Sequence, residues 1–577
     1  MSNDGSATVR AYVSPSCVFL AFDWAAGELH ADFLGFAVAR APGFGKGVRS
    51  SYLTNKLNFT PITSKSTPLG SNLAPIQKFN WWDGGISPAD RGKQFVYTIT
   101  PVLGSSATAL ALQTQAAATI AVTVPQPASG SIATYFNRAV VSSQSFAVLS
   151  KTASLDKQMD WLANGLQDAV PTILKESDSV ECAIYHLNDR RWILPAFQSF
   201  SGRASIVYFD KKADHTSAKG IAVLSGKRNI SEHSRTKIRG LMHDKFIVSN
   251  QGGRDTAVLM GSTNFTPEAQ TIQANLLHII RSPQLANLYA ERAALLAGDP
   301  STAETSQGAA WHPITDVPGT ALRVFFPPEP KKDRQFLDTV TRAVQNAKSS
   351  VLFCMFTATD QPLLDAIFAV GDRTDGIIFG LLNSIDDPDQ PTKSGKPRKS
   401  SPISVEIYNR SCRDKLTLAY DRFRPGSAPA GFLPELASID TRKYSGGKGP
   451  PIAIHIHHKF IVIDGDTAHP TIYTGSPNFS ANSENSNDEN VLEITGNTQV
   501  AQVYVAEFLR LYNHYRARAL WNRAHPPTKS KAKPKVQTTA SRGSKAPSLT
   551  LATSRDAWVK GAYKAGTKEY LARVKKL

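Results

Sequence analysis

The first part of the chain contains short apolar or alternating stretches separated by turn-forming residues. Four of them are rich in β-branched and aromatic residues: Cys17–Asp23, Phe33–Arg40, Gln94–Leu103 and Ala117–Val124. Such stretches predict β-strands, and the clusters of Pro, Gly and Ser between them predict loops. Short strands at this spacing are typical of a β-sandwich, which we predict for residues 1–128.

These strands resemble the fibronectin type III family. The runs VFLAFDW, LGFAVAR and FVYTITPV carry the resemblance, with Trp24 on an early strand and Tyr97 on a late one, as in the core of that family. The resemblance implies a module that scaffolds or binds, so we assign no chemistry to it.

Downstream of this region, a helix followed by a strand is predicted twice. Asp156–Glu176 has apolar residues at helical spacing, and Pro171 should kink this helix or end it. A second helix is predicted over Asp333–Ala347. Each leads into an apolar strand that begins with Ser-Val, at Ser179 and at Ser350. The repeated order predicts an α/β region made of two similar halves.

A polar motif occurs once in each half. Residues 243–265 and 457–479 begin HDKFIVSN and HHKFIVID, end GSTNF and GSPNF, and are identical at nine of 23 positions without a gap. At average residue frequencies roughly one or two identities are expected. Because the repeated residues include His, Lys, Ser and Asn, which can carry chemistry, the repeat indicates duplication of a site.

The motif predicts a site for a phosphate diester. Residues i and i+2 share one face of a strand, so His243 lies beside Lys245 and His457 lies beside Lys459. A lysine buried beside a histidine is costly unless an anion is near. Two such pairs suit a phosphodiester, because the lysines can bind its non-bridging oxygens. One histidine can then attack phosphorus while the other protonates the leaving oxygen.

More polar side chains follow each motif. Four of them can donate hydrogen bonds to the phosphate or to the histidines and lysines: Ser262, Asn264, Ser476 and Asn478. Glu489 lies 11 residues after Asn478 and could accept from a histidine ring N–H, which would fix the tautomer of that ring. The first half has no acid at the equivalent place, where Gln273 or Asn275 is nearest.

The pattern H-x-K-x-x-x-x-D followed by G-S-x-N resembles the signature of the phospholipase D superfamily. The second copy, which includes Asp464, matches it fully, whereas the first copy has Asn250 in place of the Asp. The resemblance implies an α/β fold of two fused halves, residues 129–320 and 321–524, preceded here by the all-β sandwich. It further implies a phosphohistidine intermediate, no cofactor and no required metal. In the family His243 would be the nucleophile, His457 the general acid and Asp464 a supporting residue.

The positive charge is concentrated at the C-terminus. The chain has a formal net charge of +18, and residues 529–577 contribute 13 basic and two acidic residues to it. We predict that residues 525–577 form a basic, flexible tail whose last part, Arg555–Leu577, could be helical. Such a tail is either only solvated or attaches the protein to an anionic membrane surface or to nucleic acid.

The composition of the chain also bears on its cellular location. No stretch approaches the roughly 18 apolar residues that a membrane helix needs, and the first 30 residues lack the pattern of a signal peptide. The four cysteines are scattered without a C-x-x-C pair, which indicates neither a zinc site nor a disulfide framework. We therefore predict a cytoplasmic protein, with peripheral membrane attachment as an alternative.

Three functions fit these observations. The chain could be a phospholipase D-type enzyme that hydrolyses or exchanges phospholipid head groups, a nuclease or other nucleic-acid phosphodiesterase, or a binding protein with a silent site. Family nucleases are often short chains that dimerise, so the length of 577 residues favours the phospholipid substrate and a monomer. The mild charge outside the C-terminal region also argues against a groove that tracks nucleic acid. The sequence leaves the choice between phospholipid and nucleic acid open.

Overall fold

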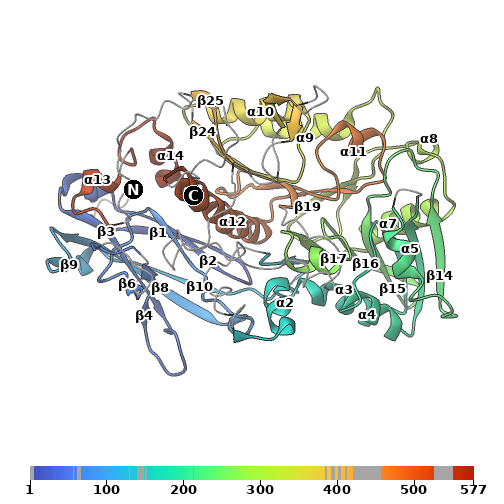
Figure 1. The fold of residues 1–577 in the computed structure, drawn as a ribbon, viewed down its shortest axis with the longest axis horizontal. Coiled ribbons are helices and arrows are strands. Elements are labelled where there is room, and N and C mark those ends of the chain that lie inside the picture. Colours follow the sequence, from blue (N-terminus) through green and yellow to red (C-terminus); the bar gives the residue numbers. More distant parts are fainter. Residues whose placement is uncertain are drawn as a thin grey trace, which may run out of the picture.

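The computed structural model describes residues 5–55, 57–60, 67–128, 130–139, 149, 152–211, 214–383, 386–391, 397–399, 404–409, 412–419, 456–524, 550–559 and 561–577. These residues build a β-sandwich and two large mixed sheets, each flanked by helices. In Figure 1 the sandwich is blue, the first large sheet is mostly green, and the second runs from yellow to orange. The long helix α12 (Thr498–Ala524) lies in the middle of the molecule.

The N-terminal residues form the predicted sandwich. One sheet has the order β1-β2-β7 and the other the order β10-β8-β3-β4, with β9 paired to β8. The strands are β1 (Thr8–Val13), β2 (Val18–Asp23), β3 (Phe33–Ala41), β4 (Ser51–Tyr52), β7 (Asn80–Asp83), β8 (Gln94–Gly104), β9 (Leu110–Leu112) and β10 (Ala118–Thr123), and the short pair β5 (Thr54–Asn55) and β6 (Leu69–Gly70) lies beside them. Trp24 and Tyr97 are both buried in the core between the sheets. All four predicted strands are confirmed, and the fibronectin type III resemblance stays a prediction.

The first α/β half is built around a sheet of order β11-β17-β16-β15-β12-β13-β14. Its strands are β11 (Ile132–Phe136), β12 (Ser179–Ile184), β13 (Arg203–Phe209), β14 (Ile230–Arg235), β15 (Lys245–Gln251), β16 (Arg254–Gly261) and β17 (Leu276–Arg281). Its helices are α2 (Leu155–Ala163), α3 (Ala169–Lys175), α4 (Ile193–Ser199), α5 (Thr216–Ile221), α6 (Pro267–Thr271), α7 (Pro283–Ala297) and α8 (Thr302–Thr305).

The second half repeats this order as β19-β28-β27-β26-β20-β21-β24, with β18 and β25 added at the edges. Its strands are β18 (His312–Ile314), β19 (Ala321–Phe325), β20 (Ser350–Met355), β21 (Ile377–Leu382), β24 (Ser404–Asn409), β25 (Cys412–Ala419), β26 (Lys459–Ile463), β27 (Thr471–Gly475) and β28 (Val491–Thr495); β22 (Asp386–Pro391) and β23 (Pro397–Lys399) pair separately. Its other helices are α9 (Gln335–Gln345), α10 (Gln361–Asp372) and α11 (Ala481–Asn485). The matching strand order confirms the predicted pair of α/β halves.

One predicted helix differs from expectation. The segment 156–176 is divided into α2 and α3, and the break falls at Asn164 and Gly165 rather than at Pro171. Both break residues have positive φ, 55° and 92°, a conformation that ends a helix. Pro171 lies in the first turn of α3, where its missing N–H costs no hydrogen bond.

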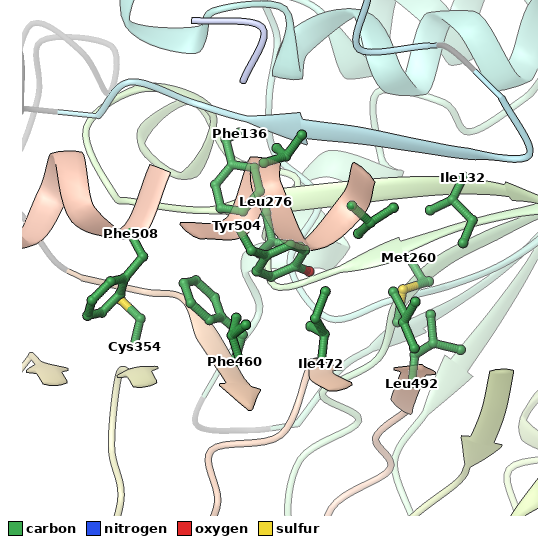
Figure 2. Close-up of a cluster of buried hydrophobic side chains, with 14 of the residues drawn as sticks. Ile132, Phe136, Met260, Leu276, Cys354, Phe460, Ile472, Leu492, Tyr504 and Phe508 are labelled. Atoms are coloured by element: carbon green, nitrogen blue, oxygen red, sulfur yellow. The ribbon is translucent and has the colours of Figure 1, made fainter. Parts of the chain in front are cut away.

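A shared apolar core joins the two halves (Figure 2). Tyr504 of α12 packs edge-on against Phe136 of the first half, 5.1 Å between ring centroids, and against Phe460 of the second half at 5.0 Å. Its hydroxyl lies 2.7 Å from Nε2 of the buried His278. Each such aromatic pair is worth about 0.5–1.5 kcal/mol beyond its burial. The helix therefore fixes the position of one half relative to the other.

The C-terminal residues 550–577 correct the prediction of a flexible tail, because they fold against the sandwich. They contain α13 (Arg555–Val559) and α14 (Lys568–Lys575). The indole N–H of Trp558 donates to the carbonyl oxygen of Phe33 at 2.8 Å, and the two rings pack edge to face. The segment is basic overall, but it also contains apolar side chains such as Trp558 and Val559. These side chains are buried in the core of the sandwich.

Helix α14 also joins the sandwich to the second half. Arg573 forms an ion pair with Asp23 of β2 at 2.8 Å, and the Lys575 ammonium donates to the hydroxyl of Ser349 at 2.7 Å. Part of the positive charge of the segment thus serves contacts within the molecule. Residues 525–549 lie outside the described residues.

Two further sequence expectations can be compared with the structure. Cys17, Cys182 and Cys354 are buried free thiols, whereas the side chain of Cys412 lies outside the described residues. Among the residues that the structure describes, no helix has both the length and the apolar character needed to cross a membrane.

Candidate active site

The two histidines lie where the halves meet. His243 and His457 each precede the strand that carries the rest of their motif, β15 and β26. The backbone N–H of His243 donates to the carbonyl oxygen of Asp488 in the second half at 2.8 Å, and that of His457 donates to Ala274 in the first half at 3.0 Å. Each half therefore holds the histidine of the other through its backbone.

Each histidine side chain likewise has its hydrogen-bond partner in the opposite half. Nδ1 of His243 lies 2.8 Å from Oε2 of Glu489, and Nδ1 of His457 lies 2.9 Å from Oδ1 of Asn275. Glu489 and Asn275 both follow the Asn of their G-S-x-N by 11 residues, so they occupy equivalent positions. The predicted contact of Glu489 with a histidine ring is present, and the histidine belongs to the opposite half.

These partners fix the tautomers of both rings. A carboxylate oxygen and an amide oxygen can only accept, so each histidine donates its Nδ1–H. The Asn275 amide nitrogen donates to the backbone oxygen of Ala269 at 3.1 Å, which orients its oxygen toward His457. Nε2 is consequently the nitrogen of each ring that can react with a substrate.

Ser262 and Ser476 form hydrogen bonds with the side chains that hold the two histidines, Asn275 and Glu489. The Ser262 hydroxyl donates to Oδ1 of Asn275 at 3.0 Å, and Ser476 makes the corresponding hydrogen bond to Glu489. Both serines are fully buried. The structure therefore places them behind the histidine partners, which agrees with a framework role and differs from direct phosphate binding.

The lysines lie beside their histidines as strand geometry predicted. The Lys245 ammonium donates to the backbone oxygen of His243, and the Lys459 ammonium donates to that of His457 at 2.7 Å. Both lysines are buried. Two lysine side chains thus lie beside the two histidines, where an anionic phosphodiester would bind their charged forms.

Sequence reasoning missed two aromatic rings in the site. The ring of Tyr185 lies 5.0 Å from the ring of His243 and 4.9 Å from the Lys245 ammonium. Phe356 makes the same contacts with His457, at 5.0 Å, and with Lys459, at 5.1 Å. Both are the first residue after the strand that begins with Ser-Val, so the repeat itself carried the signal. An aromatic face stabilises each ammonium by about 0.5–2 kcal/mol.

The electrostatics favour a neutral imidazole at His243 beside an ionised carboxylate at Glu489. Burial lowers the pKa of the His243 imidazole to about 4, although the Glu489 carboxylate opposes this shift. Burial would raise the pKa of Glu489, but its attraction to His243 and Lys245 and its hydrogen bonds lower it to about 2. At neutral pH His243 therefore has a lone pair on Nε2 and an Nδ1–H held by Glu489.

Burial also lowers the pKa of both lysines, that of Lys245 to about 7 and that of Lys459 well below its ordinary value. The nearby positive charge of Lys245 adds to the effect at Lys459. A phosphate anion between them would favour the charged forms of both.

Asn264 and Asn478 occupy equivalent positions in the two copies of the motif. The side-chain oxygen of each is buried without a hydrogen-bond partner among the described residues. Their proposed role in binding phosphate stays a prediction.

Asp464 is not brought to the site. It lies at the far end of β26, five residues from Lys459, which is roughly 16 Å along a strand. Its carboxylate accepts from the backbone N–H groups of residues 348–350 at 2.6–3.1 Å and so anchors the start of β20. Asn250 occupies the same position in the first half and donates to Asp255 at 3.0 Å. The difference between Asn250 and Asp464 is therefore remote from the chemistry.

A buried ion-pair network holds the strand end that carries Glu489. Asp488 accepts from Nε of Arg235 at 2.9 Å, and Arg292 lies 3.4 Å from its other oxygen. Arg235 also pairs with Asp299 at 2.9 Å. Breaking such a buried pair typically costs about 3–5 kcal/mol. Because both arginines belong to the first half and Asp488 to the second, the network also joins the halves.

The other histidines of the second motif are not placed in the site. His458 is buried against the rings of Phe136 and Phe460 and is part of the framework, and His455 lies outside the described residues. Among the described residues, no group of three or more His, Cys, Asp or Glu side chains is arranged to hold a metal ion.

Comparison with known proteins identifies the family. A family model described as a cardiolipin synthase, PLD-like domain matches residues 340–512, which include the half-site from His457 to Glu489. Residues 340–512 thus contain a phospholipase D-like domain, which supports membership of the phospholipase D superfamily. This membership supports a phosphodiesterase or phosphotransferase type of activity. No curated protein matches the sequence.

Several solved structures resemble the chain over limited lengths. Polyphosphate kinase from Porphyromonas gingivalis is 11% identical with a TM-score of 0.34, and the match covers 58% of this chain and 46% of that one. Phosphatidylserine synthase from Haemophilus influenzae is 12% identical with a TM-score of 0.38, covering 60% and 84%. Nuc, a phospholipase D family member from Salmonella typhimurium, is 18% identical with a TM-score of 0.21, covering 23% and 87%. The chain thus spans less than half of the polyphosphate kinase. These similarities say nothing about the substrate.

Proposed function

We propose that this phospholipase D-like chain is a phosphodiesterase that acts on phospholipid head groups through a covalent phosphohistidine on His243. The observation that carries the proposal is the difference between the two histidine partners. Glu489 is a carboxylate and Asn275 an amide, although they occupy equivalent positions. A carboxylate stabilises the positive charge that a histidine gains when it attacks phosphorus, whereas an amide oxygen only orients the ring.

The first step joins phosphorus to His243. Nε2 of neutral His243 attacks phosphorus with its lone pair, and Glu489 stabilises the imidazolium that results. The bond from phosphorus to the leaving oxygen breaks on the opposite side, and protonated His457 gives its Nε2 proton to that oxygen. Lys245 and Lys459 hold the non-bridging oxygens, where negative charge gathers in the transition state.

The second step releases the phosphoryl group. His457, now neutral, accepts a proton from a water molecule or an alcohol as that oxygen attacks phosphorus. The phosphorus–nitrogen bond breaks and its electron pair returns to His243. Water gives hydrolysis and an alcohol gives transfer, so both products use the same residues.

Phospholipid is favoured over nucleic acid by the distribution of charge. Residues 1–528 carry only about seven of the 18 net positive charges, and Arg573 and Lys575 of the C-terminal segment make contacts within the protein. A protein that tracks a nucleic-acid backbone needs many free cations along a groove.

The test is to offer phosphatidylcholine vesicles and plasmid DNA in parallel to the wild-type protein and to His243→Asn. We expect release of choline or phosphatidic acid from vesicles by the wild type and none by the variant. Cleavage of DNA without turnover of vesicles would replace this proposal by the nuclease. Absence of both reactions would contradict a phosphodiesterase that uses either substrate.

A further inference from the structure

A buried carboxylate lies between the histidine and the lysine of the first motif. Asp244 follows His243 and precedes Lys245, and its side chain is fully buried. Its Oδ1 accepts from Nδ2 of Asn490 at 2.6 Å, and its Oδ2 is buried without a hydrogen-bond partner among the described residues. Asp244 takes no part in the two steps described above.

The hydrogen bond between these two side chains joins the second half to the first. Asn490 directly follows Glu489 in the sequence. Its side-chain oxygen accepts from the hydroxyl of Tyr289 at 3.1 Å, which turns its amide nitrogen toward Asp244. The preceding Asp488 is also held by the first half, through the two arginines of the ion-pair network. Side chains of the first half therefore hold the residues on both sides of Glu489.

The second half has no polar pair at the equivalent positions. Asp244 corresponds to His458, whose ring packs against two phenylalanine rings. Asn490 corresponds to Leu276, which is part of the shared apolar core. Docking the opposite half at this position thus needs no charge. The carboxylate on the side of His243 therefore indicates an electrostatic function.

The charge of Asp244 acts on Lys245. Burial raises the pKa of Asp244 to about 7. The guanidinium of Arg292 opposes this shift, and the carboxylates of Asp488 and Glu489 add to it. Burial lowers the pKa of Lys245 to about 7, and the negative charges of Glu489 and Asp244 oppose that shift. Without the charge of Asp244, the neutral form of Lys245 would be more populated at neutral pH.

The other titratable groups near the two side chains are neutral or positive. Burial raises the pKa of Tyr289 on α7 well above its ordinary value, and the nearby Asp244 adds to this shift. Burial lowers the pKa of three groups, and the positive charge of Lys245 lowers it further: His186, His243 and Lys459. The charged form of Lys245 therefore depends on Glu489 and Asp244.

We propose that Asp244 is a positioning residue that acts on the active site in two ways: it holds the strand end that carries Glu489, and its charge keeps Lys245 in the ammonium form that binds the phosphodiester. The inference rests on the proposed function, in which Lys245 holds a non-bridging oxygen. It adds a dependence of that function on pH, because both side chains change their charge near neutrality.

Two substitutions separate the two effects. Asp244→Asn keeps an oxygen that accepts from Asn490 and removes the charge, whereas Asp244→Ala removes both. The readout is kcat/KM for a p-nitrophenyl diester as a function of pH, which reports ionisations of the free enzyme. Because p-nitrophenolate leaves without help from an acid, the ionisation of His457 does not limit this reaction. Wild-type kcat/KM should fall as the pH rises through about 7, where Lys245 loses its charge.

Both variants should move this basic limb to lower pH. A nearby opposite charge shifts a pKa by about one unit or more, so kcat/KM above the limb should fall about tenfold in Asp244→Asn. Asp244→Ala should add a loss that is equal at every pH, because the strand end with Glu489 is no longer held. A role in folding alone would lower the melting temperature and leave the limb in place.

A third variant gives the same test without changing Asp244. Asn490→Leu removes the donor that favours the ionised carboxylate, and it should also move the basic limb to lower pH. Leucine fits this backbone, since the N–H of Leu276 donates to Ser262 as that of Asn490 donates to Ser476. This variant decides the question if Asp244→Asn does not fold.

The sandwich supplies a matched control. Asp83 is also buried, pairs with Arg40 at 2.8 Å and accepts from the hydroxyl of Tyr97 at 2.9 Å. Asp83→Asn should lower the melting temperature and leave the basic limb unchanged. A limb that stays in place in Asp244→Asn, or moves to higher pH, would overturn the proposal whether or not kcat/KM falls.

Equilibrium binding separates this inference from the proposed function. Dimethyl phosphate, an anionic diester, is titrated by calorimetry at pH 7 into His243→Asn, with and without Asp244→Asn, in two buffers that differ in ionisation enthalpy. A neutral Lys245 takes up a proton when it binds the anion, so Asp244→Asn should raise the uptake by about half a proton. That increase supports the inference even if the catalytic proposal fails. Equal uptake in the two proteins, or no binding in either, would overturn the inference even if the enzyme hydrolyses diesters.

Discussion

Replacing Glu489 by Gln tests the difference between the two histidine partners. The substitution keeps the size of the side chain and removes the charge, so that His243 has an amide partner as His457 has Asn275. The lost interaction is a buried, charge-assisted hydrogen bond of 2.8 Å, and such bonds contribute about 1.5–3 kcal/mol. We therefore expect kcat/KM for a soluble chromogenic diester to fall about 10- to 150-fold.

The pH dependence of kcat/KM in the variant gives an independent test, because the direction in which the acidic limb moves can be predicted. His243 must be neutral to attack, so wild-type kcat/KM should fall as the pH decreases through about 4, the pKa of the buried imidazole. The Glu489 carboxylate raises that pKa, so its removal should move the acidic limb to lower pH. Circular dichroism at each pH separates this effect from acid unfolding.

Glu493 provides the control for Glu489→Gln, because it lies on β28 only four residues further along and is also buried. Its carboxylate pairs with Arg323 and accepts from the hydroxyl of Tyr473 at 2.6 Å, outside the active site. Glu493→Gln should lower thermal stability and leave kcat/KM within about twofold. Equal losses of kcat/KM in the two variants, or an acidic limb that moves to higher pH in Glu489→Gln, would refute the role given to Glu489.

Three further outcomes follow from the structure. Trp558→Ala removes a buried ring and its hydrogen bond to Phe33, so it should lower the free energy of unfolding by about 3–5 kcal/mol in thermal melts and leave the rate on a short soluble diester unchanged. Asp464→Asn should likewise lower the melting temperature without changing kcat/KM at lower temperature, and a selective loss of kcat would place Asp464 in the chemistry. Excess chelator should leave activity intact, because the lysines supply the charge that a metal would provide; loss restored by a divalent ion would contradict this.

Local patterns in the sequence were sufficient to predict the four sandwich strands and the two histidine–lysine pairs. The strands of the sandwich have alternating or wholly apolar sequences, and the two copies of the motif repeat with identical spacing from His to Gly. Since His243 and Lys245 are two residues apart on one strand, their proximity is dictated by strand geometry. The same holds for His457 and Lys459.

The contacts between the two halves could not be predicted from local sequence patterns. Asn275 and Glu489 each serve the histidine of the opposite half, and that exchange depends on how the two sheets dock around α12. The position of Asp464 at the far end of its strand follows from counting residues, but its bonds to the backbone of residues 348–350 require the neighbouring strand. A helix within Arg555–Leu577 could be expected from the sequence, but its packing against the sandwich could not, because basic residues far outnumber apolar side chains such as Trp558 in this segment.

The central claim is that two half-sites form one active site with His243 as the nucleophile. Rapid mixing of His243→Asn and His457→Asn with a p-nitrophenyl diester tests it most directly, because p-nitrophenolate leaves without help from an acid. The account predicts that His457→Asn releases one equivalent of p-nitrophenolate in a burst and then turns over slowly, since no base activates water, whereas His243→Asn shows no burst. A burst in His243→Asn and none in His457→Asn would contradict the assignment of the nucleophile. Steady-state activity above about a tenth of wild type in either variant would contradict the single shared site.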